Sequence, residues 1–406
     1  MQITGFRAFG GEHAESATIK NLLAFAGVEN PNTGQPLSEP LCFGIAGGIG
    51  AGYSFCPSMI HHGFGSGIHI VGRHKSYATS AIWYEGFFQR VGISPRILET
   101  TSKSRAFQNL LEELKENRPV VVWCSRPALP YLGNSLDACD LQMYTFIVFG
   151  LDEEKNLAHG SDRAPTPVTL SLEVLATARN GVCSHRNRTL TIGPGQTISK
   201  EKLKQGIEDG IKACADHLLH GKMKTYSLPG LEIWAKMIAN NKNKDGWLKV
   251  YPGPLLFSAL RDVFLSIENT GVRGGLLRPI YADFLDEAAQ ITGRKPLSDL
   301  AEDYRNLANL WTALAEHALP SKIKSFKQTK DLLRKKLKLF TEKGEKGHQG
   351  IEDASAKLRQ LEVEINLKMP LQGQEADQLL QELRQEILVL HAAEVQTAQK
   401  LLRALE

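Results

Sequence analysis

The fold is decided by residues 145–179, which read TFIVFGLDEEKNLAHGSDRAPTPVTLSLEVLATAR. The run that begins at Thr145 is short, apolar and rich in β-branched and aromatic residues, so it predicts a buried strand. The segment SLEVLATARN predicts a helix of one or two turns. Asp162 and Arg163 lie between the two, where their spacing favours a structural ion pair. The alternative is that Asp162 orients a histidine in a Cys-His-Asp site.

The sequence before this stretch mixes helical and strand patterns. A helix is predicted from near Glu12 to Gly27, because apolar residues recur at helical spacing and a glycine ends the run. The apolar positions are Ile19, Leu22, Leu23 and Ala26. Three short apolar runs bounded by breakers predict buried strands, namely LCFGI, IHIVG and PVVVWC. We therefore predict a mixed α and β domain over residues 1–200.

After residue 200 the apolar pattern becomes helical. The segment KLKQGIEDGIKACADHLL places four apolar residues on one face, Ile207, Ile211, Ala215 and Leu218. Further helical segments follow up to residue 320, and glycines at 271, 274 and 275 separate two of them. This pattern predicts an all-helical domain over residues 201–320.

The last segment, residues 321–406, differs in its charge. Eight lysines and arginines face one acid between Ser321 and Phe340, whereas Ile351 to Glu406 holds ten acids and six bases. Leucines at helical spacing predict an amphipathic hairpin or small bundle. One interpretation is an arm for partner docking or self-association, which would make a homo-oligomer through residues 321–406. The other is a helical extension that folds back on its own domain.

Composition excludes several classes of protein. The chain has 406 residues, of which 42% are hydrophobic and 23% charged, and its net charge is +4. This predicts a globular protein, and the charge is too small to indicate nucleic-acid binding. No apolar run reaches the length of a membrane span, and the first residues lack the features of a signal peptide, so we expect a cytoplasmic protein without membrane contact. Six scattered cysteines predict reduced thiols.

Two local clusters invite a ligand hypothesis. The glycine-rich run GIAGGIGAGY, residues 44–53, lacks the Lys-Ser/Thr of a phosphate loop and does not meet GxGxxG spacing. It predicts a tightly turned loop that approaches other backbone closely. Four histidines crowd the next segment without a carboxylate at metal-ligand spacing, which predicts a polar loop. They are His61, His62, His69 and His74. We therefore expect no metal and no cofactor.

Several segments occur in an order that carries a family resemblance. They are GGEHAESATIKNLLAFAG, LSEPLCFGIAGGIGAGY, GRHKS and the stretch quoted above. Together they resemble the N-terminal domain of the butirosin biosynthesis protein H family. VRGGLLRPIYADFLDEAA and YRNLANLW resemble the helical domain that accompanies it. The resemblance covers roughly residues 5–320, and the tail from about 321 lies outside it.

The resemblance implies a fold and a chemistry. The fold is α+β, with a papain-like or C39-peptidase-like domain followed by an all-α domain and a C-terminal helical arm. The implied chemistry is acyl transfer in secondary metabolism, in which a cysteine accepts an acyl group from a carrier-protein thioester and an amine then takes it. A cysteine at a helix N-terminus suits this step, because the helix dipole and a paired histidine stabilise its thiolate.

This chain departs from the family pattern at two of the three catalytic positions. The family shows His-Cys at the start of the first helix, where this chain has His13-Ala14, and the family's histidine falls on Thr145. Asp162 matches the third position. A methyl group cannot attack a thioester, and threonine is not a base at neutral pH. Ser16 faces away from position 14 on the helix, so a relocated nucleophile would have to be Cys42 or Cys56.

The remaining residues of the implied site would bind substrate. They are His13, Glu39, Arg73 and Arg278. For Glu39 and Arg278 the alternative is structural, because an acid after Ser38 can cap a helix and an arginine after two glycines commonly bonds to helix carbonyls.

Ala14 leaves three explanations: a cysteine replaced deliberately to trap a complex, a natural non-catalytic member, or catalysis by positioning alone. The leading hypothesis is a degenerate acyltransferase that acts as a binding or scaffolding protein for a small amine, a peptide or an acyl-carrier protein. The second is an active acyl or aminoacyl transferase. The third is a structural protein that self-assembles through the C-terminal arm.

Overall fold

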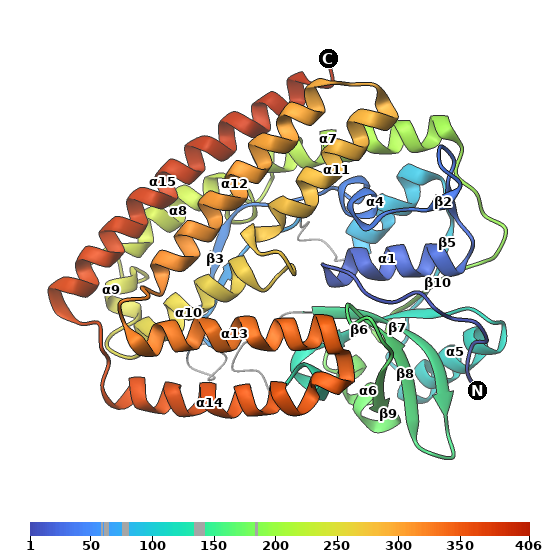
Figure 1. Ribbon diagram of the computed structural model, residues 1–406, viewed down its shortest axis with the longest axis horizontal. Coiled ribbons are helices and arrows are strands. Elements are labelled where there is room, and N and C mark those ends of the chain that lie inside the picture. Colours follow the sequence, from blue (N-terminus) through green and yellow to red (C-terminus); the bar gives the residue numbers. More distant parts are fainter. Residues whose placement is uncertain (58–59, 61–64, 75–80, 134–142, 183–185) are drawn as a thin grey trace. The chain divides into compact units, whose positions relative to one another are not determined.

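The computed structural model describes all residues except 58–59, 61–64, 75–80, 134–142 and 183–185. The chain forms two compact units, each drawn from three separated segments. Unit 1 comprises Met1–Cys42, Phe88–Leu203 and Lys335–Ser355, and unit 2 comprises Phe43–Phe87, Lys204–Arg334 and Ala356–Glu406. The architecture is mixed α and β, with a sheet in the N-terminal part and helices in the C-terminal part (Figure 1). These units do not coincide with the three consecutive domains expected from the sequence, which stay a prediction.

Unit 1 is built on a six-stranded sheet in which each neighbouring pair is antiparallel. Its strands, in spatial order, are β5 (Pro95–Leu98), β10 (Thr189–Ile192), β6 (Val120–Ser125), β7 (Met143–Asp152), β8 (Leu157–Ser161) and β9 (Val168–Ser171). The strands predicted at PVVVWC and TFIVFGLD are confirmed as β6 and β7. In β7 every residue from position 144 to 151 is buried, which is the pattern of a strand covered on both faces.

The register of β7 decides which side chains share a face. Thr145 pairs with Trp123 of β6, and Ile147 pairs with Ser161 of β8. Tyr144 pairs with Cys124 of β6. Because successive side chains on a strand point to opposite faces, Thr145, Ile147 and Ser161 share one face, and Tyr144 and Cys124 share the other.

Helices cover both faces of this sheet (Figure 1). They are α1 (Ala14–Phe25), α5 (Lys103–Lys115) and α6 (Leu172–Asn180), and a short hairpin of β1 (Glu29–Asn30) and β2 (Gln35–Pro36) follows α1. Helix α1 packs against β7 on the face of Ser161, whose Oγ lies 3.5 Å from Asn21 Nδ2 of α1. Helix α6 packs against β6 on the face of Cys124, which is close to Arg179 of α6. The helices predicted at residues 12–27 and at SLEVLATARN are therefore confirmed.

The strand predicted at LCFGI is wrong, because these residues belong to helix α2 (Glu39–Ile45). Ser38 starts this helix by accepting a hydrogen bond at its Oγ from the backbone N–H of Leu41 (3.2 Å), and Pro40 suits the first helical turn. These start signals outweigh a five-residue apolar run, which cannot by itself distinguish a strand from a buried helix.

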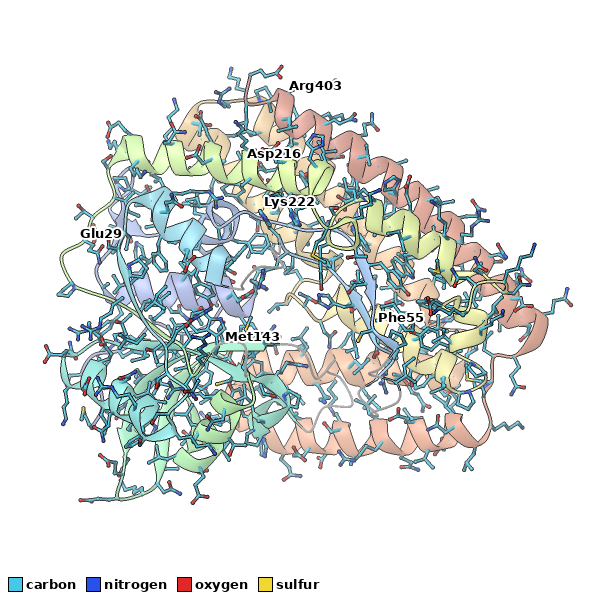
Figure 2. All side chains as sticks on the ribbon, turned by 180° about the vertical axis from the view of Figure 1, so that it is seen from behind. Glu29, Phe55, Met143, Asp216, Lys222 and Arg403 are labelled. Carbon is cyan, nitrogen blue, oxygen red and sulfur yellow. The ribbon has the colours of Figure 1, made fainter. Side chains whose placement is uncertain are left out.

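Unit 2 is mainly helical. Its two strands are β3 (Tyr53–Phe55) and β4 (Ile68–Ile70), which pair with each other. Its helices are most of α7 (Lys200–His220), then α8 (Pro229–Ile238), α9 (Trp247–Val250), α10 (Leu255–Glu268), α11 (Arg278–Thr292), α12 (Pro296–Ala318) and α15 (Gly373–Arg403). Helices α8 and α12 pack against α15. Figure 2 shows the side chains from behind, with Phe55, Asp216 and Arg403 marking β3, α7 and α15, and Glu29 and Met143 marking β1 and β7 of unit 1.

In the part of the chain that the structure describes, each boundary between the two units falls within a helix. One of these helices is α2, and four others follow it along the chain. They are α4 (Ala81–Val91), α7, α13 (Lys324–Lys343) and α14 (His348–Leu367). Residues 335–355, which include the end of α13 and the start of α14, belong to unit 1, and the remainder of residues 321–406 belongs to unit 2. Helix α15 packs against α8 and α12 of its own chain, whereas the docking or self-association role of residues 321–406 stays a prediction. Among the described residues, no helix combines the length and the apolar character needed to cross a membrane.

Candidate functional site

The start of α1 is held by its own first residues. His13 is the N-cap, with extended backbone angles, and its ring Nδ1 lies 3.2 Å from the Oγ of Ser16 and 3.5 Å from the backbone N of Ser16. Ala14 is the first residue of the helix and is half-buried. Position 14 therefore lies where a nucleophile would meet the positive end of the helix dipole, but its side chain is a methyl group.

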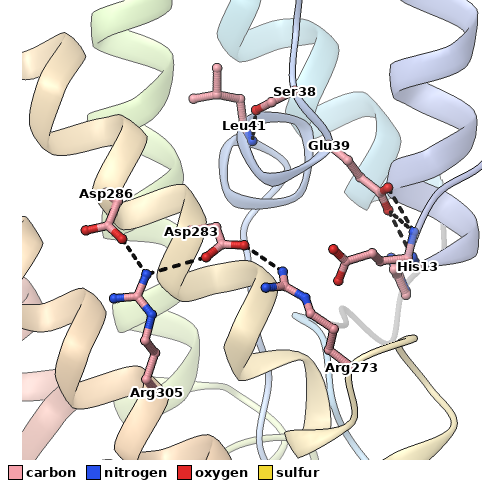
Figure 3. A network of polar contacts seen from close by, with 9 residues as sticks. His13, Ser38, Glu39, Leu41, Arg273, Asp283, Asp286 and Arg305 are labelled. Atoms are coloured by element: carbon pink, nitrogen blue, oxygen red, sulfur yellow. Dashed lines mark hydrogen bonds and ion pairs between the residues drawn. The ribbon is translucent and has the colours of Figure 1, made fainter.

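The buried carboxylate of Glu39 accepts hydrogen bonds from the polar groups beside this helix end (Figure 3). Glu39 accepts hydrogen bonds from the backbone N–H groups of Glu12 and His13, each at 2.9 Å, and from the Oγ of Ser16 at 2.8 Å. Burial raises the pKa of Glu39, although these donors and nearby Lys20 act against the shift. Gly11 permits this approach, because a Cβ there would lie 2.8 Å from Glu39 Oε2 and 2.3 Å from the Cβ of Ala17.

Asp162 is the centre of a second buried network in unit 1. Its carboxylate accepts hydrogen bonds from the hydroxyls of Tyr131 (2.9 Å) and Tyr144 (2.8 Å) and from the backbone N–H of Arg163 (2.6 Å). The side chain of Arg163 also donates from Nε to the Tyr144 hydroxyl at 3.2 Å. Burial raises the pKa of Asp162, while Arg163 and the tyrosine hydroxyls act against the shift. Asp162 is therefore hydrogen-bonded to Tyr144. Tyr144 is the neighbour of Thr145, the position where the family resemblance places the catalytic histidine.

The two networks are joined within unit 1. The backbone N–H of Gly10 donates to the carbonyl of Ala164 at 2.9 Å, which ties the segment before α1 to the segment that follows Asp162. The pKa of Arg163 is raised overall. Burial acts to lower it, but the interactions with Tyr144, Asp162 and Glu39 raise it by more. Unit 1 contains five of the seven residues of the predicted site, namely His13, Ala14, Glu39, Thr145 and Asp162, and their grouping into one site stays a prediction.

The C-terminal segment completes this region. The ring of Phe340, in α13, stacks on Tyr131 with centroids 5.8 Å apart, and the guanidinium of Arg163 lies 5.7 Å from the centroid of the same ring. Gly344 follows, and a Cβ there would lie 2.4 Å from the Oγ1 of Thr166. The Asp162 network is therefore covered by residues from the far end of the chain, which no local pattern in the first 200 residues indicates.

The other two predicted substrate-binding residues belong to unit 2. Arg73 is half-buried, donates to the carbonyl of His74 at 2.8 Å and lies 5.3 Å from the ring centroid of Trp83. Arg278 has no exposed surface; its Nε donates to Glu394 and its Nη1 to the carbonyl of Leu276, both at 2.8 Å. The geometry of Arg278 is that of the structural alternative. Glu39 also has a structural role, but it bonds to the backbone N–H groups just before α1 rather than capping α2, the helix to which it belongs.

The glycine-rich run lies against other parts of unit 2, as the sequence predicts. Gly48 has a φ of +64°, and a Cβ there would lie 2.4 Å from the ring of Tyr281. A Cβ on Gly47 would lie 2.6 Å from the Nδ1 of His74. Among the predicted histidine cluster, His61 and His62 lie outside the described residues. Within the described ranges no group of three His, Cys, Asp or Glu side chains could hold a metal ion.

His74 instead stacks on a histidine that the sequence analysis missed. The rings of His74 and His217 are 4.1 Å apart at an angle of 19°. The Nε2 of His217 is buried without a hydrogen-bond partner among the described residues, and a backbone hydrogen bond to Tyr226 engages this side chain. Burial lowers the pKa of His217 to about 4, and Arg73 adds to the shift.

This pKa makes the stability of unit 2 depend on pH. Between pH 6.5 and about 4 the unfolded chain binds a proton at His217 that the folded chain does not bind, so the free energy of unfolding falls as the pH falls through this window. The expected contribution is at most about 3 kcal/mol. His217→Gln is expected to lessen the pH dependence of urea unfolding. His220→Gln, an exposed position on α7, is the matched control, and an equal effect of both variants would contradict the assignment.

The described cysteines differ in burial and in the pKa of their thiols. Burial raises the pKa of Cys124 and of Cys214, each to about 12, so both stay thiols at neutral pH. Cys42 is buried and Cys56 is exposed. Cys139 and Cys183 lie outside the described residues. Three residues around Asp162 were not predicted from the sequence, namely Tyr131, Tyr144 and Phe340. Of these, only Tyr144 could have been found from the sequence, because it directly precedes Thr145.

These features define a class: a mixed α and β N-terminal part with a helix start and a buried Asp in one unit, followed by a helical part. Two family models match the chain. The model described as Butirosin biosynthesis protein H, N-terminal, matches residues 13–163, and the model described as Domain of unknown function (DUF4872) matches residues 173–346. The chain is thus similar to the butirosin biosynthesis protein H family over residues 13–163 and to the domain of unknown function over residues 173–346. The first match begins at His13 and ends just after Asp162, and the second runs past the expected limit at residue 320, which is corrected to 346. No curated protein matches the chain.

Proposed function

We propose that this chain is a catalytically degenerate member of an acyltransferase-like family and acts as a binding or scaffolding protein. The observation that carries the proposal is Ala14. It is the first residue of α1 and is half-buried, and it stands where the family resemblance places a cysteine. A site without a nucleophile cannot form an acyl-enzyme intermediate.

The electrostatics of the helix end support the same proposal. In a cysteine acyltransferase the positive end of the helix stabilises a thiolate. In this chain Glu39 accepts hydrogen bonds from the two backbone N–H groups just before the helix and from Ser16. A second anion at position 14 would lie close to this buried carboxylate, so the site is not arranged to hold a thiolate.

We further propose a papain-like fold for the N-terminal domain. Supporting it are the packing of α1 on an antiparallel sheet, the position of Thr145 on the sheet face that α1 covers, and the position of Asp162 just after β8. The ligand proposed for His13 and Glu39 is a small amine, a peptide or an acyl-carrier protein, and Arg73 is not part of this proposal because it belongs to unit 2. Arg278 is left out, because it is fully buried in its ion pair with Glu394.

Acyl transfer from thioesters tests the proposal directly. The full chain carrying Cys56→Ser, which removes an exposed thiol, is incubated with acyl-coenzyme A thioesters and primary amines. We expect intact-mass spectrometry to show no acyl adduct and chromatography to show no amide above the uncatalysed rate. Adding Ala14→Cys together with Thr145→His or Tyr144→His is expected to produce an acyl adduct. The variant that gives more adduct identifies which of the two positions on β7 corresponds to the family's catalytic histidine.

One result would contradict the proposal of a degenerate enzyme, and two variants would then identify its cause. Amide formation by the unmodified chain would establish an active transferase. If that activity disappeared in Cys42→Ala or Cys56→Ala, the nucleophile would have been relocated. Activity that survived both changes would establish catalysis by positioning alone.

A further inference from the structure

The last helix, α15, carries two opposite stripes at the same spacing. One runs from Ala376 to Leu401 through positions 380, 383, 387, 390, 394 and 397, and every one of these side chains is buried. It faces the rest of unit 2, where α8 and α12 pack against α15 (Figure 1). Alternating steps of four and three residues keep these positions on one side of a helix.

The opposite side repeats the same spacing on the exposed surface. Positions 374, 378, 381, 385, 388, 392, 395, 399 and 402, here called the outer stripe, also alternate in steps of four and three. The first four are glutamines, and Leu388, Ala392, Val395, Gln399 and Leu402 follow. Seven of the nine are exposed, and Val395 and Leu402 are half-buried. Within the stripe, Leu388 keeps 36% of its surface exposed, and Val389, next to the stripe, keeps 62%.

The outer stripe differs from an ordinary solvent face because it has no charge. The exposed side of a surface helix usually carries charged residues, yet none of the nine positions is Asp, Glu, Lys or Arg. The stripe spans four heptads, or about 42 Å of helix, and its apolar members, Leu388, Ala392, Val395 and Leu402, all lie in its second half. Charged residues instead flank it, with Glu375 and Glu382 near one end and Arg403 at the other.

We propose that the outer stripe pairs with the same stripe of a second copy of this chain, in antiparallel orientation. Core positions then match when their numbers add to 780, which pairs Leu388 with Ala392 of the second copy, Val395 with Gln385 and Leu402 with Gln378. The two-fold axis passes near position 390. The apolar residues therefore meet one another at the centre of the interface. Flanking positions such as 389 match when their numbers add to 778, so Val389 lies opposite Val389 of the second copy.

Charge favours this orientation over the parallel one. In the antiparallel pair, Glu375 lies opposite Arg403 of the second copy, at both ends of the interface by symmetry. In a parallel pair, Asp377 would instead lie opposite Glu382 of the second copy, and like charges there oppose association. The antiparallel arrangement also sets the two helix dipoles in opposite directions. This inference is independent of the proposed acyltransferase ancestry, since it uses only unit 2.

Size-exclusion chromatography with light scattering on the full chain tests the interface. We expect a dimer, and Val389→Asp is expected to weaken it at least about 100-fold, because two like charges then face each other across the axis. Val363→Asp is the matched control, since Val363 on α14 is similarly exposed, at 58%, and lies off the stripe. It should leave the dimer and the circular dichroism spectrum unchanged.

A charge-reversal cycle tests the orientation. Glu375→Arg and Arg403→Glu should each weaken the dimer, and the double variant should restore it, because the antiparallel pair is regenerated with its signs exchanged. A chain that stays monomeric from about 1 to 100 µM overturns the proposal. A dimer that tolerates Val389→Asp overturns it as well, and a dimer disrupted by Val389→Asp but without rescue in the double variant overturns the antiparallel orientation.

Discussion

Replacing Glu394 with alanine is expected to lower the free energy of unfolding by about 3–5 kcal/mol. Glu394 and Arg278 have no exposed surface, and one oxygen of Glu394 accepts hydrogen bonds from Arg278 Nε (2.8 Å) and Trp311 Nε1 (2.7 Å). Without the carboxylate, a guanidinium remains buried with no opposite charge. Urea unfolding followed by tryptophan fluorescence measures the loss, because Trp311 lies in the cluster.

The cause can be separated from a general sensitivity of the fold. Asp331→Ala removes an ion pair between side chains that are more than half exposed, and should cost less than about 0.5 kcal/mol. Replacing both partners, Arg278→Met with Glu394→Leu, should recover most of the stability, since a buried pair is commonly no better than apolar residues of similar size. If Glu394→Ala were as mild as Asp331→Ala, the pair would not be buried as described.

The pair also supports an unusual backbone. Leu276 and Leu277 have φ angles of +48° and +67°, in the left-handed region that non-glycine residues rarely adopt. Such residues cost on the order of 1–3 kcal/mol each unless their surroundings hold them. Both side chains are buried, and Arg278 Nη1 donates to the carbonyl of Leu276. The structure thus gives Arg278 a positioning role within the motif VRGGLLRP.

Replacing Glu39 with alanine is expected to cost about 3 kcal/mol in unit 1, because three donors at the start of α1 lose their acceptor together. They are the N–H groups of Glu12 and His13 and the hydroxyl of Ser16. Glu39→Gln keeps an acceptor oxygen and should cost less. Glu112→Ala, at an exposed acid paired with Arg105 on α5, is the control and should cost less than about 0.5 kcal/mol.

The same variant tests the electrostatic argument about position 14. In a chain carrying Ala14→Cys, adding Glu39→Gln should lower the pKa of the introduced thiol, because a neighbouring negative charge is removed. The rate of alkylation by iodoacetamide as a function of pH measures that pKa. An unchanged pKa would mean that Glu39 does not influence the helix end.

The sequence was informative where local signals agree. The apolar run of β-branched and aromatic residues from Thr145 identified β7, and the helical spacing of Ile19, Leu22 and Leu23 identified α1. LCFGI failed because a short apolar run has no period of its own, and the helix signals of Ser38 and Pro40 precede it. The family resemblance supplied Ala14 and Asp162, which no period indicates.

The candidate site could be predicted only in part, since its contacts are made across the chain. A shift of one residue on β7 exchanges Thr145 for Tyr144 at Asp162, and the sequence cannot fix that register because β7 is buried on both faces and its apolar run does not alternate. Phe340 covers Tyr131 and Arg163 from a distance of about two hundred positions along the chain. The pairing of Arg278 with Glu394 likewise joins residues 116 positions apart.

The division of the units among distant segments has a consequence for how the protein is made. Unit 1 needs residues 335–355, and unit 2 needs residues 356–406. During synthesis on the ribosome, neither unit can therefore finish assembling until nearly the whole polypeptide has emerged. Earlier-made parts of unit 1, such as β9, which contacts residues 344–347, and Tyr131, which stacks on Phe340, wait for these late partners with apolar surface uncovered. This is the condition under which nascent proteins aggregate or recruit chaperones.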